Sequence, residues 1–163
     1  MAITASVKPS SAEIDEIFNV TAGLAELTPR PITVLRELAK DGRLVLIHSG
    51  GQLAGWAAVE HLTSNLSELG MVYVKPEFRS AEAFDALIQE IAKRPERMLL
   101  ATYTGAIMRY AAKVWQAREI GLLKAILLSR GRFLTKRLNP NSRESIRGRL
   151  ANANPRYALV ERR

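Results

Sequence analysis

The sequence predicts an α/β protein built on one mixed sheet with helices on both faces. Three observations predict this class. Apolar residues make up 47% of the 163 residues, which is enough for one core of ordinary size. Segments with a two-residue apolar period alternate with segments of helical period, in the order β-α-α-β-β-β-α-β-α-β-β. The chain also shows no internal repeat.

The N-terminal segment predicts a strand followed by two helices. Residues 3–7 alternate apolar and polar side chains, as in a short strand. Ser10 and Glu13 have the spacing of a capping box, which predicts that a helix begins here. A second helix should begin near residues 28–31 and end at Gly42, where we expect a left-handed cap.

Three strands are predicted next. Residues 43–49 and 52–62 are β-rich runs joined by Gly50-Gly51, and this pair predicts a hairpin because both glycines tolerate a positive φ. A phosphate-binding turn at Ser49-Gly50-Gly51 is the less favoured alternative. Residues 68–74 predict the third strand, which Pro76 ends.

The remaining elements complete the alternation. The predictions are a helix at 80–93, a strand at 97–103, a helix at 106–117, a strand pair at 122–129 and 133–138 that turns at Arg130-Gly131, a weak helix from about 142, and a last strand at 157–160.

The composition excludes several classes of site. Cysteine is absent, so disulfides, thiolate catalysis and Cys-type zinc sites are excluded. Two histidines do not build a His-rich metal centre, so we predict no metal. The chain has no apolar run of membrane-spanning length and its first ten residues do not have the pattern of a leader. We therefore expect a cytoplasmic protein.

The net charge of +8 is confined to one end of the chain. Residues 1–128 hold 14 Lys/Arg and 14 Asp/Glu, whereas residues 129–163 hold 10 Lys/Arg and only Glu144 and Glu161 as acids. Together with the break at Asn139-Pro140-Asn141, this predicts a globular body over 1–138 and an Arg-rich C-terminal extension over 139–163.

The basic section predicts an anionic partner. Arginine presents a planar fork of donors that suits phosphate or carboxylate groups. The candidate partner- or anion-binding residues are Arg130, Arg132, Lys136, Arg137, Arg143, Arg147 and Arg149. We expect an acidic protein or a neighbouring subunit in an oligomer. Nucleic acid is an alternative partner, although no nucleic-acid-binding motif is present. A solvated basic face is the plainest alternative.

Two segments carry a resemblance to a known family. Residues 68–79, which end in Val-Lys-Pro-Glu-Phe-Arg, and residues 104–121 are similar to two motifs of the GNAT acyltransferase superfamily. The resemblance covers about residues 1–138. It implies a central, mostly antiparallel sheet flanked by helices, with acetyl-CoA as the cofactor. Residues 104–121 would form the family's penultimate helix and lead into its sixth strand.

The resemblance also implies a set of site residues. Glu68 falls at the position of the family's frequent general base, where a carboxylate relays a proton from an amine. The strand residues Val72, Tyr73 and Val74 would hold the thioester, and Arg79 and Ser80 would lie at the pyrophosphate. The plainer alternative for Glu68 is an ordinary strand residue that faces solvent.

Some residues depart from the family pattern. The family's turn reads Arg-Gly-x-Gly-x-Gly/Ala, whereas residues 79–84 contain no glycine. Glu82 places a carboxylate in the first helical turn, where it would repel a phosphate. Ala111 stands where a tyrosine commonly serves as the acid. The neighbouring Tyr110 is turned to another helical face by about 100°.

These departures favour a non-catalytic role. The sequence predicts a GNAT-fold protein that has lost its acetyl-CoA site and acts as a binding or assembly component, similar to phage-encoded GNAT-like virion proteins. On that prediction the location is the cytoplasm or a virion. The alternative is an acyl-CoA-dependent N-acetyltransferase with an atypical cofactor site.

Overall fold

The computed structural model describes residues 2–24, 27–102, 105–137 and 155–161. The strands are β1 (Ile3–Ser6), β2 (Leu44–Ser49), β3 (Gln52–Thr63), β4 (Leu66–Val74), β5 (Arg97–Thr102), β6 (Arg118–Ile120) and β7 (Arg156–Val160). The helices are α1 (Ser11–Ala22), α2 (Ile32–Lys40), the short 3-10 helix η1 (Pro76–Phe78), α3 (Ala81–Ala92), α4 (Gly105–Trp115), α5 (Leu122–Leu128) and α6 (Arg132–Arg137).

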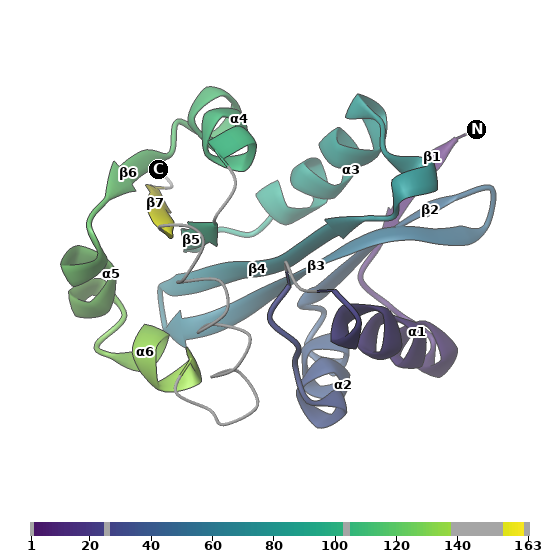
Figure 1. The fold of residues 1–163 in the computed structure, drawn as a ribbon, viewed down its shortest axis with the longest axis horizontal. Helices are drawn as coiled ribbons and strands as arrows, with labels where there is room; N and C mark the ends of the chain where they lie inside the picture. Colours follow the sequence, from purple (N-terminus) through teal and green to yellow (C-terminus); the bar gives the residue numbers. More distant parts are fainter. Residues whose placement is uncertain (1, 25–26, 103–104, 138–154, 162–163) are drawn as a thin grey trace. The chain divides into compact units, whose positions relative to one another are not determined.

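The strands form one mixed sheet in the order β1-β2-β3-β4-β5-β7-β6 (Figure 1). β4 and β5 pair in parallel, whereas β1 with β2, β2 with β3, β5 with β7 and β6 with β7 pair antiparallel. The predicted mixed α/β class is therefore confirmed. The chain divides into two compact units, residues 1–60 with 70–95 and residues 61–69 with 96–163.

In the first unit, α1 begins where the sequence predicts. Both hydrogen bonds of the capping box are present, because the Ser10 hydroxyl accepts from the backbone N–H of Glu13 and the Glu13 carboxylate accepts from that of Ser10. The same carboxylate lies 2.5 Å from Nε2 of His48 on β2. Glu13 thus satisfies the helix start and also fastens α1 to the sheet.

Glycines make the turns of the first unit possible. Gly42 follows α2 with a φ of 65°, and Gly50 and Gly51 join β2 to β3 with φ of 58° and 81°. All three are in the left-handed region that L side chains rarely adopt. The predicted hairpin and helix end are confirmed.

The core of the first unit fills both faces of its strands. Leu44 and Leu46 of β2 pack with Ile17 of α1 and Leu35 of α2 in one cluster. Strand side chains alternate between faces, so the buried Val45 and Ile47 point to the opposite face. There α3 packs against β1 and β2. Figure 1 shows α1 and α2 together on one side of β2 and β3, and α3 on the other side.

In the second unit, β7 is an interior strand. It pairs on one side with β5, where Leu100 lies opposite Ala158, and on the other with β6, where Ile120 lies opposite Tyr157. The predicted strand at 157–160 is therefore present. Although the sequence assigned these residues to the C-terminal extension, they contribute a strand to the sheet. The predicted helix from about 142 lies outside the described residues.

The predicted strand pair at 122–129 and 133–138 is wrong. These segments form the helices α5 and α6, joined by Arg130 and Gly131 with φ of 52° and 77°. Ala125 and Phe133 turn inward and join a core cluster of the second unit. The turn was placed correctly, but the apolar run of α5 was mistaken for a buried strand.

The described residues contain neither a candidate membrane-spanning helix nor a candidate metal-binding cluster. None of the described helices combines the length and the apolar character needed to cross a membrane. The described side chains also form no group of three acidic or histidine residues that could hold a metal ion.

Candidate functional site

β4 is distorted at Met71. The backbone of Met71 is in the left-handed region, with a φ of 53°, although its side chain is buried. On β3, Trp56 and Leu62 are an even number of residues apart, so their side chains are on the same face of the strand. On β4, Tyr73 shares a core cluster with Trp56, and Leu66 shares one with Leu62. Tyr73 and Leu66 are an odd number of residues apart, which a regular strand would place on opposite faces. β4 therefore carries one extra residue, as in a β-bulge. Such strain in a buried residue is a reason to look for function nearby.

Glu68 lies on β4 three residues before Met71. Its exposed fraction is 2%, so the alternative of an ordinary strand residue facing solvent is wrong. Burying an ionised carboxylate costs free energy, and proteins retain such groups where they are paired or where they serve a reaction. The role of Glu68 as a general base stays a prediction, and it now applies to a buried carboxylate.

The predicted thioester strand continues beyond the bulge. Val72 and Val74 are partly exposed, whereas the Tyr73 side chain packs in the core with its ring centroid 4.9 Å from that of Trp56. Tyr73 therefore offers only its backbone to a ligand. The carbonyl of Val74 accepts a hydrogen bond from Nε of Arg79 at 3.2 Å. This bond ties the end of β4 to the segment that leads into α3.

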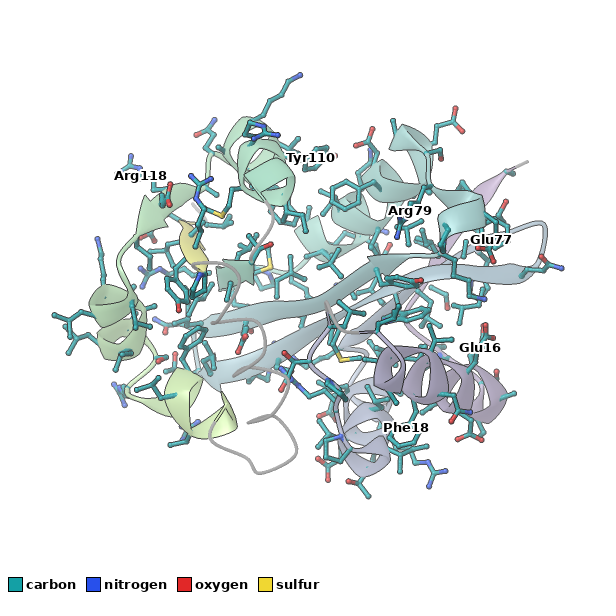
Figure 2. All side chains as sticks on the ribbon, viewed as in Figure 1. Glu16, Phe18, Glu77, Arg79, Tyr110 and Arg118 are labelled. Atoms are coloured by element: carbon teal, nitrogen blue, oxygen red, sulfur yellow. The ribbon has the colours of Figure 1, made fainter. Side chains whose placement is uncertain are left out.

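The start of α3 is capped by the chain itself. The Ser80 hydroxyl accepts a hydrogen bond from the N–H of Ala83 at 3.1 Å, which occupies one of the free donors of the helix start. Arg79 and Glu82 are both exposed beside this cap. Figure 2 shows Arg79 and Glu77 on the segment between β4 and α3. One cation and one anion therefore stand at the expected pyrophosphate position.

A buried ion pair that the sequence analysis missed lies in the first unit. Nε of Arg30 and Oε1 of Glu60 are 2.8 Å apart, and their side chains are 12% and 7% exposed. Arg30 precedes α2 and Glu60 lies on β3, so no local period connects them. The sequence offered one indication of this ion pair. Pro29 and Pro31 flank Arg30 and restrict the backbone around it.

α4 presents the residues that the sequence compared with the family acid. Ala111 is buried, and Tyr110 is partly exposed on a different face of the helix. The side chain at the buried position therefore has no proton to donate.

The predicted basic residues are only partly described. Arg130 is exposed in the turn between α5 and α6, and Nη1 of Arg132 donates to the carbonyl of Leu62 at 3.1 Å. Lys136 and Arg137 lie in α6, and their side chains are outside the described part. Arg143, Arg147 and Arg149 are outside the described residues as well.

The surface of α5 is apolar. Leu123 and Leu127 are 71% and 69% exposed, and they lie four residues apart, on one face of the helix. Leu122 on α5 and Leu134 on α6 are exposed too. Exposed leucines at this spacing are typical of a surface that another molecule covers.

Solved structures share this fold. The chain matches Rv2747 from Mycobacterium tuberculosis in complex with CoA and NLQ at a TM-score of 0.66 and 14% identity, covering 99% of both chains. It matches a GNAT-family acetyltransferase from Bacillus cereus at 0.61 and 12%, covering 100% and 99%. It matches N-acetylglutamate synthase from Neisseria gonorrhoeae, in complex with CoA and N-acetyl-glutamate, at 0.64 and 12%.

These likenesses show that the chain has a GNAT-like fold, as the resemblance of residues 68–79 and 104–121 implied. The match to the Neisseria synthase covers 99% of this chain but only 36% of the synthase. No protein-family model matches the sequence, and no curated protein matches it. The link to phage virion proteins stays a prediction.

Proposed function

We propose that the protein is an acyl-CoA-dependent N-acyltransferase with an atypical site for the diphosphate. The observation that carries this proposal is the bulge at Met71 on the same strand as the buried Glu68. Two proteins with this fold, the mycobacterial protein and the Neisseria synthase, are in complex with CoA, which supports the same reaction class here. This function is the alternative that the sequence allowed beside a non-catalytic binding component.

The residues of β4 fit an acyl thioester. A bound acyl-CoA supplies an activated acyl group. The bulge breaks the regular ladder, so the backbone of Val72 to Val74 is the segment that would position the thioester carbonyl. Glu68 would accept the proton that the acceptor amine loses, directly or through one water. With alanine at 111, the leaving thiolate would take its proton from solvent. Positioning then supplies most of the rate enhancement.

The diphosphate end fits less closely. Ser80 already caps one N–H of α3, and residues 79–84 offer no glycine for a close backbone approach. Lys75 is paired with Glu16, so it contributes little charge. Arg79 is exposed, and its hydrogen bond to the carbonyl of Val74 is made through Nε. Arg79 would therefore supply the positive charge at this end, and Glu82 would weaken binding.

Isothermal titration calorimetry with acetyl-CoA tests the proposal. We expect saturable binding at micromolar to sub-millimolar ligand, about 10-fold weaker in Arg79→Ala because one charge-assisted contact is lost. Arg36→Ala is the matched control, since Arg36 is an exposed arginine of α2. Absence of saturable binding below about one millimolar would overturn the proposal and favour the binding component predicted first.

That binding component is the second candidate function, and the surface of α5 is the observation that favours it. The exposed Leu123 and Leu127 lie near Lys124 in sequence, and Arg130 and Arg132 follow them. Two copies of such a face would bring like charges together. An acidic protein partner with an apolar centre is therefore the occupant that we propose.

A synthetic amphipathic peptide with leucines flanked by glutamates is a suitable probe for this surface. Binding should be lost in the double variant Leu123→Ser/Leu127→Ser and kept in Leu24→Ser, a change on a partly buried leucine elsewhere. Self-association detected by sedimentation, or equal binding of duplex DNA, would contradict an acidic protein as the partner.

A further inference from the structure

Two arginines of the second unit approach one point at the start of α4. A Cβ atom built on Gly105, the first residue of α4, would lie 3.3 Å from Nη1 of Arg109 and 3.6 Å from Nη1 of Arg156. Arg109 extends from α4 itself, whereas Arg156 is the first residue of β7, against which α4 packs (Figure 1). All three residues belong to the second unit, so this arrangement lies within one compact unit.

Glu119 orients Arg156. Its carboxylate oxygens accept hydrogen bonds from Nε and Nη2 of Arg156 at 2.9 and 2.7 Å. Glu119 lies opposite Ala158 in the pairing of β6 with β7, and Arg156 is two residues before Ala158, so both side chains are on one face of the sheet. Two parallel hydrogen bonds to one carboxylate set the plane of the guanidinium. Nη1, its third nitrogen, is the one that approaches Gly105.

The second unit is rich in positive charge. Residues 61–69 and 96–163 hold 15 Lys/Arg and only 5 Glu, whereas the first unit holds 9 Lys/Arg and 11 Asp/Glu. Arg109, from the part of the sequence in which the charges balance, therefore belongs to the same unit as the basic C-terminal section. Two guanidinium groups that approach one point repel each other, and an anion between them offsets that repulsion. Charge and geometry together favour an anion at this point.

We propose that Arg109 and Arg156 bind the phosphate group of a small molecule beside Gly105. The two oxygens of a carboxylate lie in one plane, and Glu119 shows that one edge of a guanidinium is enough to hold them. Phosphate oxygens point to the corners of a tetrahedron, so they accept hydrogen bonds from two guanidinium groups that come from different elements. Gly105 has no side chain to fill the point that both Nη1 atoms approach. This inference does not depend on the proposed acyltransferase function.

Phosphorus NMR titrations of the full chain, with inorganic phosphate and with glycerol phosphate at constant ionic strength, test this site. The wild type should broaden the phosphate resonance in a saturable way, with a dissociation constant of about 1 mM or below. Arg109→Gln and Arg156→Gln should each weaken binding by about 10-fold, because each removes charge-assisted hydrogen bonds. Tighter binding of glycerol phosphate would identify a phosphate ester as the ligand, and tighter binding of inorganic phosphate would identify the free ion.

Arg118→Gln is the matched control for these variants. Arg118 is an exposed arginine next to Glu119 on β6, so its side chain lies on the opposite face of the strand from that of Glu119. This variant loses the same charge as Arg109→Gln and should bind phosphate as the wild type does. An equal loss of binding in both variants would mean that phosphate responds only to net charge, and it would overturn the site.

A second kind of variant fills the site without removing either arginine. Gly105 is not in the left-handed region, so its backbone accepts a side chain. In Gly105→Glu the added carboxylate should pair with Arg109 and Arg156 and abolish phosphate binding, and an acid in the first turn of a helix should not lower the thermal midpoint. Phosphate binding that survives in this variant, or acetate that competes as well as phosphate in the wild type, contradicts the proposal. Absence of saturable broadening below about 10 mM phosphate overturns it as well.

Discussion

At the scale of single residues, Gly55 fixes how closely β3 approaches β4 in the first unit. A Cβ atom at this position would lie 2.5 Å from the carbonyl oxygen of Tyr73 and 3.0 Å from Cα of Val74. Both are backbone atoms and neither can turn aside. We expect Gly55→Ala to lower the free energy of unfolding by about 3 kcal/mol, at the upper end of overpacking effects, measured by urea unfolding.

Gly121 provides the control for that substitution. A Cβ atom there meets no heavy atom within 4 Å, and its φ of −74° is ordinary for any residue. Gly121→Ala should therefore leave stability within about 0.5 kcal/mol of the wild type. Equal stability of Gly55→Ala and the wild type would show that the two strands separate at little cost.

A substitution of Glu68 tests whether this residue accepts the proton of the acceptor amine. Glu68→Gln keeps the shape of a side chain that is 2% exposed but removes its capacity to accept a proton. If Glu68 is the base, kcat/KM for the best acceptor should fall by about 100- to 10,000-fold in the folded variant. The exposed Glu37 of α2 is the control, and Glu37→Gln should keep full activity. Activity of Glu68→Gln within about threefold of the wild type would remove Glu68 from the mechanism.

The sequence did not predict interactions between residues that are far apart in the chain. The position of Glu68 was found because it lies in a segment resembling a family motif. The pairing of Arg30 with Glu60 was not found, because a loop and a strand thirty residues apart share no period. Gly55 likewise has no local signal, since the atoms that it would meet belong to another strand.

At the scale of elements, Glu13 couples the start of α1 to β2 in a pH-dependent way. Burial would raise the pKa of Glu13, but the hydrogen bonds with His48 and Ser10 outweigh it and hold the pKa below the ordinary value of 4.5. The unfolded state therefore binds this proton more readily. The stabilisation is complete above about pH 4.5 and is lost as the pH falls through the lowered folded-state value.

Glu13→Gln should accordingly be less stable than the wild type near neutral pH, and the difference should shrink below about pH 4.5. Chemical unfolding from about pH 3 to pH 7 measures it. Glu77→Gln, a change at an exposed residue of η1, serves as the control and should show no such dependence. A difference that stays constant over this range would mean that Glu13 acts through packing alone.

Elements with a clear period were predictable, and α5 shows where the period misleads. The run of residues 122–128 is apolar enough for a buried strand, but its leucines, alanine and lysine are strong helix formers and it contains one β-branched residue, Ile126. The residue composition of this segment therefore favours a helix, although its continuous apolar run is also typical of a buried strand. Ala125 is buried while Leu123 and Leu127 are exposed, which is the pattern of a helix and not of a strand.

At the scale of the whole molecule, the order of strands was the least predictable feature. β7 is the last strand in the sequence, yet it lies between β5 and β6. Pairing of this kind depends on contacts between distant segments, so no local pattern reports it. Truncating the chain after Leu138 would remove this interior strand together with the basic residues. A test of the charge must therefore use substitutions.

The location of the charge gives the last prediction. The excess of +8 lies in residues 129–163, whereas the preceding residues are balanced. If an acidic partner binds this section, the triple variant that changes Arg143, Arg147 and Arg149 to Gln should weaken binding of a Glu-rich peptide and flatten its dependence on salt.

The control for this variant has the same net charge but a different distribution. Changing Lys8, Lys40 and Lys113 to Gln also removes three positive charges, all from exposed positions in the balanced part of the chain. Fluorescence titration of the peptide at several salt concentrations compares the two variants. An equal loss in both would mean that the partner responds to net charge. A loss confined to the C-terminal variant would mean that it recognises the place where the arginines are concentrated, because screened interactions act only within about a Debye length.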